Sequence, residues 1–332
     1  MLDHSFSLTK ALHTAIARSG RDVDDVHAVL GLSMCLCTHP AYPYPAQWSA
    51  YARDARIVQA ASALGACLRA LHPPEAATGL NGASEFAQHF QASYRPLVLH
   101  ALQNQQPVLA WQGWPGEDRL SWGLITGESN GDVGLTGMIW TEDHAGQWRS
   151  RSPLVLDTPP VQVYIVESVG TQPGGGSDLL RCAVSSALVM LGPATATRFG
   201  VLTGSGAVAF WMGELRKRGG GSMAPTQATG HQQLAASISR SVKSALRFLK
   251  KRQEGADERI AGPLNSVIAA CTMVGHHLRE LSDPMASRRL LTHPEGIAKA
   301  LRDLAEVKLA QINLLAALQS LDRALVPVSN AS

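Results

Sequence analysis

The pattern of apolar residues changes at one point of the chain, the glycine-rich segment Thr171–Ser177 (Thr-Gln-Pro-Gly-Gly-Gly-Ser). Before it, short apolar runs alternate with Gly, Pro, Asn and Asp turns, which is typical of β-strands. After it, apolar residues recur every three or four positions over long stretches, which is typical of amphipathic helices. At 332 residues, the chain is also long for a single core. We therefore predict an α+β protein with two domains, residues 1–170 and 177–326, joined by a flexible linker over 171–176.

The predicted first domain begins with helices and continues as an antiparallel sheet. Leu8, Leu12 and Ile16 share one face of a helix that Ser7 is expected to cap and Gly20 to end. Helices are also predicted at 55–64 and at 83–103, the latter broken by a proline at position 96. Strands are predicted at 66–71, 108–111, 122–126, 134–140 and 161–166. The Asn-Gly-Asp sequence at 130–132, between two of these strands, predicts a hairpin.

The predicted second domain contains only helices. Helical periodicity covers residues 178–191, 206–216, 231–252, 260–281 and 295–325. The last of these helices carries an apolar stripe formed by Ile297, Leu301, Leu304, Ile312, Leu315, Leu318 and Leu325. Long helices joined by short polar loops predict a helical bundle.

Composition excludes several classes of partner. Hydrophobic residues make up 45% and charged residues 17% of the chain, as in globular proteins. A net charge of +3 is too small to indicate binding to nucleic acid or to an anionic membrane. No apolar run approaches the roughly 18 residues needed to span a bilayer. Five scattered cysteines and the lack of a secretory signal favour a cytoplasmic protein with reduced thiols. No cofactor or metal motif is present.

Five of the seven tryptophans fall in one glycine-rich stretch of the N-terminal half: Trp111, Trp114, Trp122, Trp140 and Trp148. Trp111 and Trp122 are on neighbouring strands and are expected in the core. Trp114 stands between Gln-Gly and Pro-Gly pairs, so we expect it on a loop. An aromatic ring on a loop beside a cleft can stack on a ligand.

The order of motifs resembles that of one known family. A helix, the Gly31-Leu-Ser-Met34 motif, Pro107-Val-Leu-Ala-Trp111, the strand Trp122-Gly-Leu-Ile-Thr-Gly127 and a helical second half are similar to the butirosin-biosynthesis acyltransferase family. This resemblance implies a papain-like N-terminal domain, related to bacteriocin-processing peptidases, followed by a helical domain. It also implies a cleft between the first helix and the sheet. The residues expected to bind a ligand in that cleft are Ser5, Ser7, Trp114, Ser121 and Trp122.

The catalytic residues of a papain-like enzyme are missing from the matching positions. Papain-like chemistry needs a thiolate at the start of the first helix, where the helix dipole lowers its pKa, and a histidine on the facing strand. Here the helix starts Ser5-Phe6-Ser7 and the strand starts Ser121-Trp122. The resemblance therefore implies a catalytically degenerate copy, a pseudoenzyme.

Weaker candidates for chemistry lie elsewhere. Cys35, Cys37 and His39 alternate along the chain and would share one face of an extended segment, as a nucleophile or a metal pair. The same cysteines can equally be small apolar residues of a buried strand. A third arrangement is that of a serine nucleophile and its base, formed by Ser5 or Ser7 with His4 or His13.

Three functions are consistent with these patterns. The first is a non-catalytic papain-like protein that binds a peptide or acylated ligand in the former active-site cleft. The second is an active acyltransferase or amide hydrolase with a relocated nucleophile, Cys35 or Cys37. The third is an interaction protein whose helical domain forms homo-oligomers.

Overall fold

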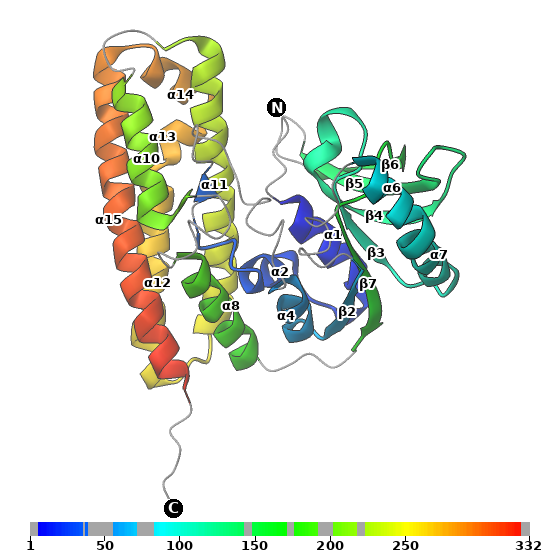
Figure 1. Cartoon of the computed structure of the whole chain (residues 1–332). Helices are drawn as coiled ribbons and strands as arrows, with labels where there is room; N and C mark the ends of the chain where they lie inside the picture. Colours follow the sequence, from blue (N-terminus) through cyan, green and yellow to red (C-terminus); the bar gives the residue numbers. More distant parts are fainter. Residues whose placement is uncertain are drawn as a thin grey trace, which may run out of the picture. The chain divides into compact units, whose positions relative to one another are not determined.

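The structure, a computed structural model of the chain, describes residues 6–35, 37–38, 56–71, 83–142, 148–170, 176–191, 202–217 and 223–326. The chain divides into two compact units (Figure 1). The first comprises Met1–Val26 and Trp48–Gly174, and the second comprises His27–Gln47 and Gly175–Ser332. The boundary between the two units at residues 174 and 175 lies within the linker predicted over 171–176. The segment from His27 to Gln47 is grouped with the helices, although the sequence patterns placed it in the first domain. The predicted bounds, 1–170 and 177–326, stay a prediction.

A six-stranded antiparallel sheet forms the centre of the first unit. In space its strands follow the order β2-β7-β3-β4-β5-β6. Their bounds are Ala66–Ala70 (β2), Val108–Trp111 (β3), Trp122–Glu128 (β4), Leu135–Glu142 (β5), Trp148–Val155 (β6) and Gln162–Val169 (β7). Glu128 pairs with Leu135 across the β4–β5 turn, which confirms the predicted hairpin. The antiparallel sheet and the mixed α+β class are confirmed as well.

Strand β6 was not predicted, because it lies at the edge of the sheet and carries no apolar run. Most of its residues are exposed, including Arg149 and Arg151. Pro153 also lies in this strand, and proline is tolerated in sheets mainly at an edge. An exposed edge strand is therefore difficult to recognise from apolar periodicity.

Alternate residues of the central strands face two different helical layers. On one face, the rings of Trp111, Trp122 and Tyr164 form a row with centroids 6.2 and 6.1 Å apart, and helix α1 (Ser7–Ala15) contacts β3, β4 and β5. On the other face, a cluster that includes Val108 and Ile165 packs against helix α7 (Arg95–Gln103). Figure 1 shows α1 and α7 on opposite sides of the sheet.

The long helix predicted at 83–103 is interrupted before its proline. It consists of α6 (Ala83–His89), a π-helical turn (Phe90–Tyr94) and α7. Pro96 lies in the first turn of α7, where its missing N–H breaks no helical hydrogen bond. The wider π-helical turn accommodates the break, which confirms the predicted interruption. Shorter helices of this unit are η1 (Ala17–Ser19), α4 (Arg56–Ala63) and η3 (Gly116–Leu120).

The second unit is a set of long helices. Its elements are α8 (Gly176–Leu191), α10 (Gly204–Lys217), α11 (Pro225–Gln253), α12 (Glu258–His277), α13 (Arg279–Ser282), α14 (Pro284–Leu291) and α15 (Pro294–Leu325). Helix α2 (Val23–Val29) crosses the boundary between the units. Helix α15 contacts α8, α10, α12 and α14. Ile297, Leu304 and Leu318 of its predicted stripe are buried, whereas Ile312 is 49% exposed, so the stripe is narrower than predicted.

Two features of the second unit were not predicted. Strand β1 (Cys37–Thr38) pairs with β8 (Leu202–Thr203) in a small antiparallel sheet. Helix α14 was also missed, although Asp283 caps it by accepting hydrogen bonds from two backbone N–H groups at 2.7 and 3.0 Å. The strand pair is too short to leave a periodic signal. None of the described helices has both the length and the apolar character required to cross a bilayer.

Candidate functional site

The first turn of α1 lies against the beginning of β4. The N-cap of α1 is Phe6, so the prediction that Ser7 caps the helix is wrong. Ser7 is instead the first helical residue, and its Oγ accepts a hydrogen bond from the backbone N–H of Trp122 at 3.1 Å. The first residue of α1 and the first residue of β4 therefore meet directly. We call this the helix–sheet contact.

The helix–sheet contact is buried. Ser7, Ser121 and Trp122 each have 0% of their surface exposed. Close to it, the ring of Phe6 lies 6.0 Å from that of Trp148. Aromatic side chains therefore pack beside the buried contact. The predicted ligand-binding residues Ser7, Ser121 and Trp122 are thus close together, but none of them is open to solvent.

No catalytic base reaches Ser7 from its own helix. His13 is six positions further along α1, which places it about 9 Å away along the helix axis. That separation exceeds the reach of a hydrogen bond between a nucleophile and its base. Burial, and to a lesser degree the nearby charge of Lys10, lowers the pKa of His13 below its ordinary value of 6.5. Within the described structure, Ser7 acts as a hydrogen-bond acceptor that joins the helix to the sheet.

Trp114 lies on the opposite face of the sheet from α1 and is only 1% exposed. Trp114 lies on the loop between β3 and η3, as predicted, but the prediction that its ring lines an open cleft is wrong. Its ring covers Gly123 and Gly137, where an added Cβ would approach ring atoms to 2.5 and 2.7 Å. Its indole N–H donates to the Ser121 carbonyl oxygen at 3.1 Å. Two strand glycines make room for this ring, and glycine inside a predicted strand is a known sign of such an approach.

The other predicted chemical groups do not assemble a site among the described residues. Cys35 is 2% exposed and thus closed to a substrate. Cys37 lies in β1, but its side chain is outside the described part of the structure, as are His4, Ser5 and His39. Among the residues that the structure describes, no three His, Cys, Asp or Glu side chains come together as metal ligands.

The remaining cysteines differ in accessibility. Burial raises the pKa of the Cys271 thiol to about 12. Burial also raises the pKa of Cys182, although a hydrogen bond with Ser186 partly opposes the shift. Cys67 is exposed, with its Sγ 3.7 Å from a carboxylate oxygen of Glu167. A thiolate is the reactive form of cysteine, so Cys182 and Cys271 are poor nucleophiles.

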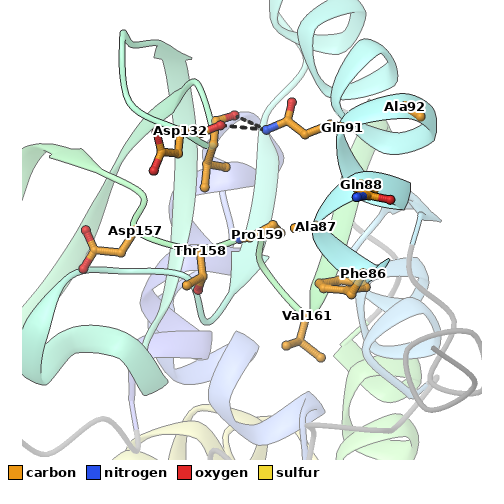
Figure 2. Close-up of a pocket in the computed structure, with 11 residues that line it drawn as sticks. Phe86, Ala87, Gln88, Gln91, Ala92, Asp132, Asp157, Thr158, Pro159 and Val161 are labelled. Carbon is orange, nitrogen blue, oxygen red and sulfur yellow. Dashed lines mark hydrogen bonds between the residues drawn. The ribbon is translucent and has the colours of Figure 1, made fainter. Parts of the chain in front are cut away.

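A cavity of about 850 Å³ lies at the end of the other sheet face, beside α6 (Figure 2). We call it the α6 cavity. Its walls come from three separate segments: α6 with the π-helical turn, the β4–β5 turn and the loop before β7. The lining residues are Phe86, Ala87, Gln88, Gln91, Ala92, Asp132, Val133, Asp157, Thr158, Pro159 and Val161. No sequence motif connects these segments, and for this reason the cavity was not predicted.

Hydrogen bonds fix the walls of the α6 cavity. The Gln91 side-chain amide donates to the carbonyl oxygens of Asp132 and Val133 at 2.9 and 3.2 Å, which ties the helix to the β4–β5 turn (Figure 2). The backbone N–H of Asp157 donates to the Gly113 carbonyl oxygen at 2.9 Å and so anchors the second loop. The cavity is therefore preformed, as most small-ligand sites are.

The lining of the α6 cavity is mainly apolar and carries negative charge. Figure 2 shows Phe86 and Val161 near each other at one end, with Asp132 and Asp157 on the opposite side. Both carboxylates are exposed to solvent. None of the eleven described lining residues is a lysine, an arginine or a histidine. This arrangement can hold an apolar group and offers no cation to an anionic ligand.

Comparison with known proteins does not assign the chain to a family. No protein-family model matches it, and no curated protein matches it. The geometry of the helix–sheet contact and of the α6 cavity is therefore the basis for a function.

Proposed function

We propose that the first unit is a non-catalytic, papain-like ligand-binding domain. We further propose that its ligand, of peptide or acyl type, occupies the α6 cavity and not the region beside Ser7. The hydrogen bond from the Trp122 N–H to Ser7 Oγ carries this proposal. This hydrogen bond supports the expected placement of α1 against the sheet. Because Ser7 and Trp122 are both buried, no room is left beside them for a substrate.

Catalysis at the helix–sheet contact would need an accessible nucleophile next to a base. Ser7 is buried, and the facing strand offers it a backbone amide and an indole ring. The Trp122 indole N–H is itself buried without a hydrogen-bond partner among the described residues. It is a donor, so it cannot accept the proton that a serine nucleophile must lose. Neither the backbone amide nor the indole of Trp122 can therefore act as the base that catalysis at Ser7 would need.

The α6 cavity has the features of a small-ligand site. Its volume lies within the range of roughly 300–1,000 Å³ that is typical of such pockets. Its lining combines apolar side chains with a few polar groups, and hydrogen bonds hold its walls in place. A domain that has lost its catalytic pair can therefore still bind a ligand, on the other face of the same sheet.

The proposal can be tested with paired variants of adjacent residues. Ala92 lines the α6 cavity, whereas Ser93 is its exposed neighbour in the π-helical turn and is not part of the lining. We expect the neutral apolar dye Nile red to bind saturably to the wild type and to Ser93→Phe. Ala92→Phe places a phenyl ring at the wall of the cavity and should weaken binding by about tenfold, which corresponds to 1.4 kcal/mol. Equal binding by Ala92→Phe, or no saturable binding at all, would overturn the proposal.

The competing hypothesis of a relocated nucleophile is tested by turnover. An acyl thioester offered to the wild type should show no saturable hydrolysis or transfer. Turnover that disappears in Cys37→Ala, while the stability of that variant is unchanged, would establish an active acyltransferase and contradict the proposal. The homo-oligomer hypothesis stays a prediction, and the molar mass in solution would test it.

A further inference from the structure

We infer that the ligand of the α6 cavity is an amphiphilic amine, a molecule with an apolar group and a positively charged nitrogen. The inference rests on the proposed function and adds the chemical class of the ligand. The apolar group would lie against Phe86 and Val161, and the cation would lie on the side of Asp132 and Asp157.

The charge of the ligand follows from the ionisable groups of the cavity. Asp132 and Asp157 are the only ionisable residues among the eleven that line it. Arg95, at the start of α7, lies against Gly134 of the β4–β5 turn and pairs with Glu128 at 3.5 Å. The cavity therefore attracts a cation and repels a carboxylate or a phosphate.

The hydrogen-bond donors of the cavity lead to the same conclusion. The side-chain amide nitrogen of Gln91 already donates to the carbonyl oxygens of Asp132 and Val133. The remaining polar side chains of the lining, those of Gln88 and Thr158, are neutral. An anionic head group would thus lose its water without gaining a charged partner, which is costly.

The apolar part of the ligand is equally necessary. Phe86, Val133, Pro159 and Val161 give the cavity an apolar wall, and Val133 is buried in the core cluster of this sheet face. Exposed carboxylates alone bind cations weakly, because solvent and salt screen the interaction. Burial of an apolar group supplies the affinity, and the carboxylates select the charge.

Three compounds with the same alkyl chain separate these contributions. Octylamine, 1-octanol and octanoate are each used to displace Nile red from the wild-type protein. We expect octylamine to bind about fivefold more tightly than 1-octanol, the upper range for exposed ion pairs, and octanoate to bind most weakly. The advantage of octylamine should disappear in about 1 M NaCl, where the screening length is about 3 Å.

Charge-neutralising variants provide the control. The double variant Asp132→Asn, Asp157→Asn should bind octylamine and 1-octanol equally, with its affinity for 1-octanol unchanged. Glu117→Gln removes an exposed carboxylate that does not line the cavity and should retain the preference for octylamine. Equal displacement by all three compounds would overturn the amine assignment and leave the proposed function standing. If Nile red itself does not bind saturably, the proposed function fails.

Discussion

The two faces of the central sheet differ in how completely side chains fill them. On the α1 face, large aromatic rings pack beside the buried contact between Ser7 and Trp122. On the α7 face, Trp114 fills the middle of the sheet, but the end beside α6 keeps a cavity of about 850 Å³. Both faces are covered by helices, and the side-chain volumes decide that the described cavity lies on the α7 face.

The largest expected effect concerns the two tryptophans that the sequence assigned to different roles. Trp114→Ala and Trp122→Ala should each lower the free energy of unfolding by about 3–5 kcal/mol, because both rings are buried. Chemical denaturation measures both values. A loss below about 1 kcal/mol for Trp114→Ala would restore the prediction that its ring lines an open groove.

A smaller effect is expected at the helix–sheet contact. Ser7→Ala leaves the buried N–H of Trp122 without its acceptor and should cost about 1–3 kcal/mol. Ser93→Ala, at an exposed position, should change stability by no more than about 0.5 kcal/mol. If Ser7→Ala instead removes an enzymatic activity with stability unchanged, Ser7 is a nucleophile and the structural interpretation is wrong.

The smallest effect is a pH dependence on the α1 face. The pKa of His13 is lowered by burial, so the unfolded chain binds this proton more tightly than the folded protein does. Stability should therefore fall as the pH decreases below about 7, through the ordinary value of 6.5 and down to the lowered pKa. His13→Gln should show a weaker loss between pH values of about 7 and 5, as measured by urea denaturation. If His13→Gln loses as much stability over this pH range as the wild type, His13 is not the cause of the pH dependence. His100→Gln, at an exposed position, is the control.

Local patterns predicted the secondary structure well. Strand β3 and the β4–β5 hairpin depend on residues close together in the sequence, and so does the helix break before Pro96. The pairing of Cys37 with Thr203 depends on contact between distant segments and was missed. The same limit applies to β6, whose exposed residues leave no apolar pattern.

The candidate site was harder to predict, because it depends on volumes across neighbouring strands. The sequence correctly brought Ser7 near Trp122, but it could not show that both are buried. Trp114 lies on a loop, as its Gly and Pro neighbours predicted, but its ring is buried against the sheet, where Gly123 and Gly137 make room for it. The α6 cavity combines three segments that share no spacing, so no pattern pointed to it.

The accessibility of position 7 tests directly whether the helix–sheet contact is closed to solvent. Ser7→Cys places a thiol at the helix–sheet contact, and the exposed Cys67 serves as an internal reference in the same molecule. Both cysteines are treated with iodoacetamide and followed by peptide mass spectrometry. We expect Cys67 to be alkylated rapidly in the folded protein. The thiol that Ser7→Cys introduces should react only after unfolding. Alkylation at both positions at similar rates in the folded protein would show an open cleft beside α1 and would contradict the account.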